Sequence, residues 1–375
     1  MEAHEFDIIA KNRSPSAAPA RLSDFDVRKI ATVAAKTLVS NPNISLYCLE
    51  HKTQLAVFVE TPSEIDIYSF PFLYAAQYEH ATKLYTLPLD IFHQLAQNLP
   101  EPRVIMLFSL GRSGSTLLGK AFNELENVFT LSEPDVFANL TGLRNAPLTD
   151  EEEIRLAQSC LRFLCKSPLH GHPGTWLIKF RGFAISIADI IHRAAPTASN
   201  IFLYRDLEAW LQSMARLTRL LERGGLEPKP LQERLGDYQL ENALTYLKYM
   251  NPRPKTLSML ESFTLSWLSM MNRYLELVSH IPFVALRYQD LVALPGMMLP
   301  ILFEHCQLGR VNAEIALNVF EQDSQEGTRF SGKANRELKH LELTQEHLQI
   351  VQDFIQIHPL LKNPDFILPK TIMPS

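Results

Sequence analysis

From about residue 100 onward, short apolar runs alternate with segments whose apolar residues recur at helical spacing. The runs have the length of buried strands, and the helical segments connect them. One run begins at residue 104, and the others cover residues 128–131, 176–180, 201–204 and 283–288. This alternation predicts an α/β fold built on a doubly wound parallel sheet. Ligands of such sheets bind at the carboxyl ends of the strands, which is where polar side chains need inspection.

The N-terminal hundred residues follow a different pattern. Residues 1–22 are polar and contain the segment RSPSAAPA, so we expect a flexible segment. Residues 24–38 carry apolar residues at helical spacing, residues 44–49 and 55–59 are strand-like, and residues 85–99 predict a strand end and a helix. Residues 23–100 therefore predict an accessory α+β region. Extra packing on one sheet edge is the simpler interpretation, and an acceptor-recognition element is the alternative. We place the main domain at residues 101–360 and a C-terminal tail at 361–375.

The run that begins at residue 104 leads into a loop of glycine, arginine and hydroxyl residues. Backbone N–H groups near Gly111 would line a concavity, and a helix from about Thr116 would direct its positive end there. Arg112 adds a full charge, while Ser113 and Ser115 add hydroxyl donors. The segment predicts a P-loop-like phosphate site, although glycine and serine turns also join strands to helices for structural reasons alone.

The loop lacks the features of a nucleotide kinase. A Walker A loop places a lysine and a hydroxyl residue directly after its second glycine. In this chain Lys120 lies a full helical turn later, and no strand-terminal pair of aspartates suggests a metal site. A P-loop kinase of small molecules, dependent on ATP and Mg²⁺, is therefore the second interpretation and not the first. We expect no metal.

A second strand–helix segment supports an anion site. The run 201–204 ends at Arg205, and Ser213 follows eight residues later, about two turns into the predicted helix. At these segments the chain resembles the sulfotransferases that use 3′-phosphoadenosine 5′-phosphosulfate (PAPS). The resemblance is closer to the carbohydrate and bacterial type than to the cytosolic aryl type. It implies a phosphosulfate loop at Arg112-Ser113-Gly114-Ser115-Thr116 and a 3′-phosphate site at Arg205 and Ser213.

Two further segments extend the resemblance. The sequence LRYQDL at 286–291 is similar to a family strand that ends in an acidic step before a helix. The sequence GTRFSGKAN at 327–335 is similar to a late loop that closes on the nucleotide, which implies contacts from Arg329 and Lys333 and places Arg336 nearby. The four matches occur in the family order between about residues 100 and 350. They imply a transferase of EC class 2.8.2 that moves a sulfuryl group from PAPS to a hydroxyl.

Sulfuryl transfer needs electrostatic stabilisation of the leaving phosphate, for which Arg112 and Lys179 are the candidates. Lys179 follows apolar residues within the run 176–180, so we expect its ammonium near a strand end. The alternative is an ordinary surface lysine. Cytosolic aryl and steroid family members place a catalytic histidine two residues after this lysine. Here that position is Arg181, which cannot be deprotonated and cannot act as a base. Trp176 and Phe180 are candidates for lining a pocket, although aromatic residues beside a strand usually belong to a core.

Glu133 is the candidate base. Carbohydrate sulfotransferases have a Glu-Pro step at this distance after the loop, and the resemblance implies a carboxylate base on the acceptor side. The alternative is that Glu133 and Asp135 only cap the turn at Pro134. His170 and His172, in the segment LHGHPG, are rival bases, but their Gly/Pro surroundings favour solvated loop residues.

The composition is compatible with a soluble enzyme that binds a small anionic donor. The 375 residues are 46% apolar and 21% charged, which is ordinary for a globular protein. The net charge of −5 argues against nonspecific nucleic-acid binding. The first residues lack a signal-peptide core, no apolar run has membrane-span length, and the four cysteines lack metal-ligand spacing. We therefore expect a cytoplasmic protein, and the resemblance implies a small-molecule or carbohydrate acceptor. A homodimer and a catalytically silent nucleotide-binding member are also compatible with the sequence.

Overall fold

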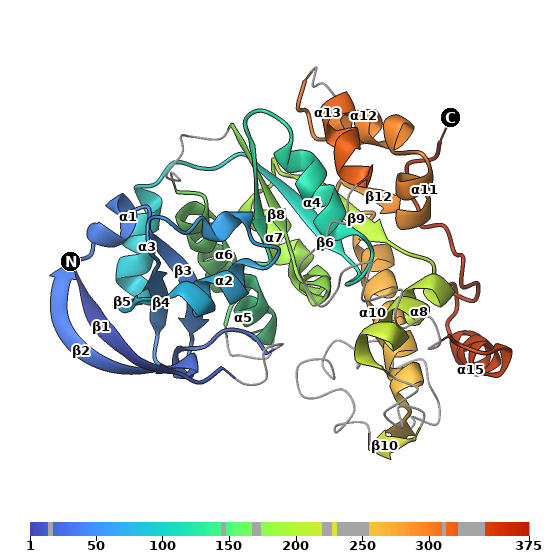
Figure 1. The fold of residues 1–375 in the computed structure, drawn as a ribbon, viewed down its shortest axis with the longest axis horizontal. Coiled ribbons are helices and arrows are strands. Elements are labelled where there is room, and N and C mark those ends of the chain that lie inside the picture. Colours follow the sequence, from blue (N-terminus) through green and yellow to red (C-terminus); the bar gives the residue numbers. More distant parts are fainter. Residues whose placement is uncertain are drawn as a thin grey trace. The chain divides into compact units, whose positions relative to one another are not determined.

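The computed structural model describes residues 1–13, 18–143, 148–166, 174–219, 227–230, 255–309, 313–321 and 342–374. The chain forms two compact units (Figure 1). Unit 1 contains Met1–Met106, Glu126–Phe180 and Ile187–Ala198, and unit 2 contains Leu107–Leu125, Arg181–Ser186 and Ser199–Ser375.

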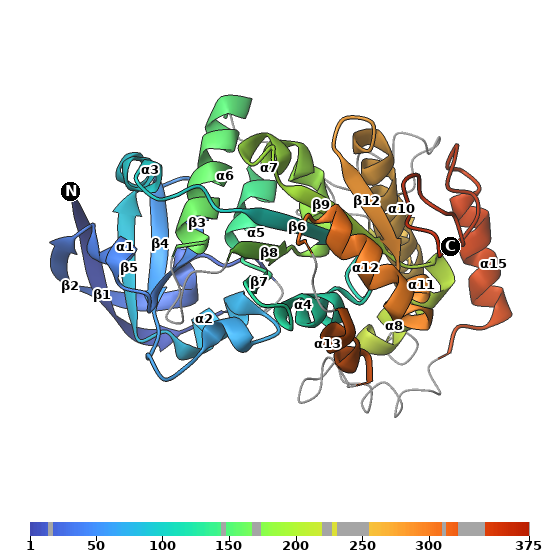
Figure 2. The ribbon, with the colours of Figure 1, turned by 90° about the horizontal axis from the view of Figure 1, so that it is seen from above.

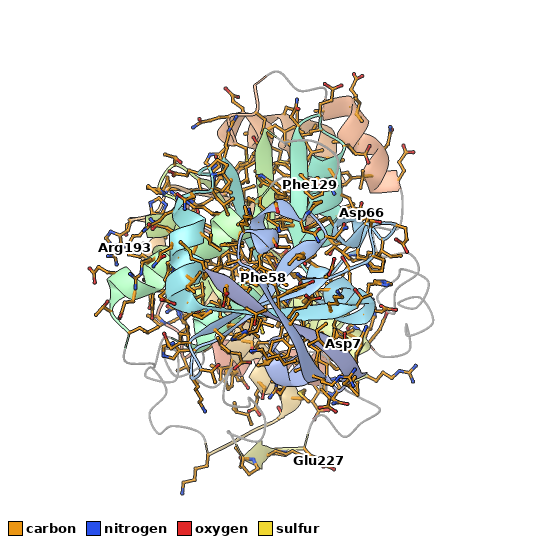
Figure 3. All side chains as sticks on the ribbon, turned by 90° about the vertical axis from the view of Figure 1, so that its left-hand side faces the viewer. Asp7, Phe58, Asp66, Phe129, Arg193 and Glu227 are labelled. Carbon is orange, nitrogen blue, oxygen red and sulfur yellow. The ribbon has the colours of Figure 1, made fainter. Side chains whose placement is uncertain are left out.

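Unit 1 contains an antiparallel sheet of order β2-β1-β5-β4-β3. Its strands are β1 (Glu2–Lys11), β2 (Phe25–Ala34), β3 (Ile44–Glu50), β4 (Leu55–Glu60) and β5 (Lys83–Pro88). Strands β5, β4 and β3 are buried along almost their whole length, as their apolar sequences require. Phe58 of β4 lies among the packed side chains of this unit, where its ring centroid is 5.3 Å from that of Phe163 and 6.2 Å from that of Phe92 (Figure 3).

Phe92 and Phe163 lie on α3 and α6, two of the helices of unit 1. The helices described in this unit are η1 (Leu22–Asp24), α1 (Thr37–Ser40), η2 (Ile67–Ser69), α2 (Leu73–His80), α3 (Leu89–Gln97), α5 (Val136–Gly142), α6 (Asp150–Leu164) and α7 (Ala188–Ala194). Thr149 caps α6 by accepting a hydrogen bond from the backbone N–H of Glu152.

Two expectations for the N-terminal region are wrong. Residues 2–11 form strand β1 instead of a flexible segment, and residues 25–34 form β2 instead of a helix. The two strands pair antiparallel, with His4 opposite Thr32 and Ile8 opposite Val27. β2 is rich in β-branched residues, which favour strands, and Ile30 is exposed rather than packed on a core-facing helical stripe. Pairing with β1 therefore outweighed the helical spacing of the apolar residues at 24–38.

The second five-stranded sheet has the order β12-β9-β6-β8-β7. Its strands are β6 (Val104–Ser109), β7 (Val128–Ser132), β8 (Thr175–Lys179), β9 (Ser199–Tyr204) and β12 (Phe283–Arg287). Within unit 1, β7 and β8 run parallel, and within unit 2, β9 and β12 run parallel (Figure 2). The predicted α/β class with a parallel sheet is confirmed, because each predicted apolar run is one of these strands.

The remaining elements of unit 2 follow or flank these strands. They are α4 (Ser115–Asn123), η3 (Gly182–Ile187), α8 (Leu207–Thr218), α10 (Met259–Leu277), α11 (Tyr288–Ala293), α12 (Pro295–His305), α13 (Ala313–Leu317), η4 (Asn318–Glu321) and α15 (Gln345–Ile355), with an antiparallel pair of short strands, β10 (Lys229–Pro230) and β11 (Thr256–Leu257). Ser258 and Thr344 cap α10 and α15 through their side-chain oxygens. Among the described helices, none is long and apolar enough to cross a membrane.

Candidate functional site

The loop between β6 and α4 has the backbone that an anion-binding turn requires. Gly114 is the N-cap of α4 with φ 90°, and Arg112 also has a positive φ, of 67°. A Cβ atom at position 114 would lie 2.5 Å from Cδ2 of Tyr288, so both the backbone angle and the close ring demand glycine. The loop thereby turns sharply into the first helical turn, where Ser115 and Thr116 are buried.

Ser113 stabilises the loop from inside. Its side chain is fully buried, and its hydroxyl donates to the carbonyl oxygens of Leu110 at 2.5 Å and Leu203 at 3.2 Å. This hydroxyl therefore ties the loop to β9, and its expected contact with a donor stays a prediction. Lys120, in contrast, is exposed on α4.

Arg112, Arg205 and Ser213, predicted from two separate segments, lie together in unit 2. Nε of Arg112 donates to Oγ of Ser213 at 3.2 Å. Nη1 of Arg205 donates to the backbone oxygen of Arg112 at 3.2 Å, and the Arg205 guanidinium lies 4.6 Å from the ring centroid of Tyr288. Nε of Arg205 is buried and has no hydrogen-bond partner among the residues that the structure describes. A buried donor of this kind is costly unless a ligand satisfies it.

The electrostatics of these arginines favour an anion. Burial lowers the pKa of Arg112, and the positive charge of Arg205 lowers it further. Burial also lowers the pKa of Arg205; Tyr288 and Asp206 oppose this shift, while Arg216 adds to it. Guanidinium groups nevertheless remain protonated. Burial and mutual repulsion thus destabilise adjacent positive charges, and a bound anion would relieve both effects.

Several residues that support this cluster were not singled out from the sequence. Nε1 of Trp210 donates to the backbone oxygen of Gly111, and Nε1 of Trp267 donates to that of Arg205 at 2.9 Å. Asp206 is engaged by Arg287, whose Nε and Nη2 lie 2.7 and 2.5 Å from its two carboxylate oxygens. Asp206 next to Arg205 was a visible signal for this pair, but the indole contacts depend on tertiary packing alone.

Unit 1 contains the other predicted catalytic residues, Glu133 and Lys179. Ser132 and Lys179 are register partners at the ends of β7 and β8, which places Glu133 beside Lys179. Nζ of Lys179 lies 3.1 Å from Oε1 of Glu133, and the backbone N–H of Glu133 donates to the Lys179 oxygen at 2.7 Å. Nζ also lies 5.3 Å from the ring centroid of Phe72.

The burial of this pair separates it from an ordinary surface contact. The Lys179 side chain is 1% exposed and the Glu133 side chain is 16% exposed, so Lys179 is not a surface lysine. Glu133 has a positive φ of 58°, an uncommon backbone state for a non-glycine residue. The arrangement presents one carboxylate with partial solvent access beside one buried ammonium.

Other residues that the sequence analysis considered are buried or make contacts within the fold. Asp135 is almost fully buried, where its Oδ2 accepts from Nη2 of Arg13 at 2.7 Å and from the Ala20 N–H at 2.9 Å. Trp176 and Phe180 are buried core residues. The Arg181 guanidinium lies 5.4 Å from the ring centroid of Phe183.

Five candidate residues lie outside the described residues: His170, His172, Arg329, Lys333 and Arg336. Within the described ranges, no group of three or more His, Cys, Asp or Glu side chains is arranged to hold a metal ion. All four cysteines are free and buried.

Comparison with known proteins gives solved structures only. No protein-family model and no curated protein matches the chain. Sulfotransferase STF9 from Mycobacterium avium is 14% identical, with 71% of this chain and 79% of that chain covered and a TM-score of 0.36. The sulfotransferase domain from the Synechococcus PCC 7002 olefin synthase is 16% identical, covers 68% of this chain and 95% of its own, and has a TM-score of 0.36.

Sulfotransferase STF1 from Mycobacterium tuberculosis H37Rv is 12% identical, with 75% and 82% of the two chains covered and a TM-score of 0.37. These solved structures all carry the description sulfotransferase, but identities and TM-scores of this size carry no weight for activity. The residues of the loop, the three-residue cluster of Arg112, Arg205 and Ser213, and the Glu133–Lys179 pair supply the chemical evidence for function.

Proposed function

We propose that the protein is a sulfotransferase that moves a sulfuryl group from PAPS to the hydroxyl of a small-molecule or carbohydrate acceptor. One observation carries the proposal: Arg112 of the loop, Arg205 and Ser213 converge in unit 2, and a buried guanidinium nitrogen there lacks a partner among the described residues. The sequence motifs that predicted a phosphosulfate loop and a 3′-phosphate pair thus bring their side chains to one place.

The residues of unit 2 fit a nucleotide with phosphates at two positions. The backbone turn at Gly114 and the first turn of α4 supply N–H donors, and Ser115 and Thr116 supply hydroxyls. Arg205 and Ser213 supply donors for a second phosphate. Charge-assisted hydrogen bonds in a sheltered site contribute about 1.5–3 kcal/mol each, so two phosphates would bind far better than one.

The reaction assigns a role to each catalytic residue. PAPS supplies a sulfuryl group whose S–O bond to the phosphate breaks as a new S–O bond forms to the acceptor oxygen. Glu133 accepts the proton of the acceptor hydroxyl, and Arg112 and Lys179 stabilise the charge that develops on the departing phosphate. Lys179 also holds the Glu133 carboxylate through the 3.1 Å ion pair. A metal ion has no role in this scheme.

Isothermal titration calorimetry without added metal tests the donor. We expect adenosine 3′,5′-bisphosphate to bind more tightly than ADP, and Arg205→Ala to lower the bisphosphate affinity by about tenfold or more while affecting ADP much less. Lys120→Ala removes one exposed positive charge from α4 and serves as the matched control, with no expected change. Tighter binding of ADP or ATP, or a requirement for Mg²⁺, would instead support a kinase.

The acceptor needs a separate experiment. Incubation of the protein with PAPS and a cell extract, followed by mass spectrometry of sulfated products, identifies the acceptor class directly. Glu133→Gln is the control for products that arise from other enzymes in the extract. Donor binding without any sulfated product would favour a catalytically silent member of the same group.

A further inference from the structure

Arg216 is a third arginine near the cluster, and no sequence motif assigned it. It lies on α8 one helical turn after Ser213, and its charge contributes to the lowered pKa of Arg205. Its Nε is buried and has no hydrogen-bond partner in the part of the chain that the structure describes. The guanidinium side chain as a whole is 25% exposed, so a ligand in solvent can reach it.

The carboxylate that faces Arg216 comes from a distant part of the chain. Oε1 of Glu342 lies 3.3 Å from Nη2 of Arg216, and the Glu342 side chain is 66% exposed. The next residue fixes this placement, because the backbone N–H of Leu343 donates to Oε1 of Gln212 at 2.8 Å. Glu342 and Leu343 thus both contact α8, and Thr344 then caps α15.

We propose that Arg216 is a third ligand of the donor's 3′-phosphate and that Glu342 is an internal competitor for it. The inference rests on the proposed function and adds a residue that determines specificity. A phosphate at pH 8 carries close to two negative charges and several acceptor oxygens, whereas Glu342 carries one charge and is exposed to water. Phosphate therefore replaces the carboxylate at Arg216, while a nucleoside without a 3′-phosphate leaves the Glu342 contact in place.

The competition predicts opposite effects for the two side chains. Glu342→Gln should raise the affinity for adenosine 3′,5′-bisphosphate by about two- to fivefold, the range expected for an exposed ion pair. Arg216→Gln should lower that affinity by about tenfold or more, since one charge-assisted contact is lost. Neither change should alter the affinity for adenosine 5′-monophosphate. In the double variant Glu342→Gln/Arg216→Gln, the gain from Glu342→Gln should disappear.

Titration calorimetry at pH 8 measures all four proteins, with Glu346→Gln as the matched control. Glu346 is an exposed carboxylate in the first turn of α15, so its replacement changes the net charge equally without touching Arg216. An unchanged affinity in Glu342→Gln, or an equal gain in Glu346→Gln or in the Arg216→Gln background, overturns the proposal.

Inorganic pyrophosphate separates this proposal from the proposed function. If the wild-type protein does not prefer the bisphosphate over ADP, the proposed function fails, but pyrophosphate still tests the competition at Arg216. Tighter pyrophosphate binding in Glu342→Gln that depends on Arg216 supports the competitor role alone. Identical pyrophosphate binding in all variants, together with unchanged bisphosphate binding, refutes it.

Discussion

Replacement of Glu133 by glutamine should destabilise unit 1 because Lys179 would keep a buried charge without its carboxylate. Breaking a buried ion pair by removing one partner costs about 3–5 kcal/mol. The Glu133 side chain is 16% exposed, and a glutamine amide oxygen still accepts from the ammonium, so we expect a smaller loss, of about 2–3 kcal/mol. With a urea dependence of about 2–3 kcal/mol per molar, this loss moves the unfolding midpoint down by about 1 M.

Urea unfolding followed by tryptophan fluorescence measures this effect, since buried Trp176 lies on β8 three residues before Lys179. Glu126→Gln, at an exposed carboxylate before β7, should change stability by no more than about 0.5 kcal/mol. The double variant Glu133→Gln/Lys179→Met removes both charges and should recover much of the loss. A Glu133→Gln midpoint equal to that of Glu126→Gln would show that the pair is solvent-screened and that the reasoning is wrong.

Three further predictions concern the loop, the base and a buried lysine. Gly114→Ala should abolish anion binding in calorimetry, because its Cβ would meet the Tyr288 ring at 2.5 Å and strain a φ of 90°; unchanged affinity would contradict the loop geometry. Glu133→Gln, assayed without urea at a temperature where it is folded, should keep donor binding but lower turnover about 10²–10⁴-fold; only a modest loss of turnover would show that Glu133 is a turn residue. Burial lowers the pKa of Lys166 from 10.5 to about 7, so the unfolded chain binds more protons between these values, and stability should rise with pH across about 7–10.5, by at most about 5 kcal/mol. In Lys166→Met the rise from this group should be absent from pH-dependent unfolding curves.

Short stretches of sequence were sufficient to predict the strands of the parallel sheet. The apolar runs that became β6, β7, β8, β9 and β12 are long enough to be buried strands and end in polar or glycine residues. Thr149 and the acidic residues after it also form a local start signal for α6, because capping involves only neighbours in the chain. Arg112 could be expected near Arg205 and Ser213, because the two arginines follow the carboxyl ends of two predicted strands of one parallel sheet.

Contacts between segments that are far apart in the chain could not be predicted from local sequence patterns. The pairing of β2 with β1 overrode the helical spacing of residues 24–38, since a strand is stabilised by its neighbour and not by its own sequence alone. Gly114 was predicted as part of the phosphosulfate loop, but the steric constraint on it comes from Tyr288, far along the chain. Arg216 had no motif at all, and only its buried Nε and its contact with Glu342 distinguish it from a surface arginine.

The ion pair between Arg13 and Asp135 has a consequence for how unit 1 is assembled. The two residues are separated by 122 positions, and the Ala20 N–H reaches the same carboxylate across 115 positions. Closing loops of this length costs entropy before any contact is gained, which slows folding. During synthesis the N-terminal strands leave the ribosome first, yet Arg13 has no Asp135 until more than a hundred further residues have followed. The N-terminal sheet can therefore pair early, but the segment around Arg13 and Ala20 docks only after β7 and the turn at Glu133 have been made.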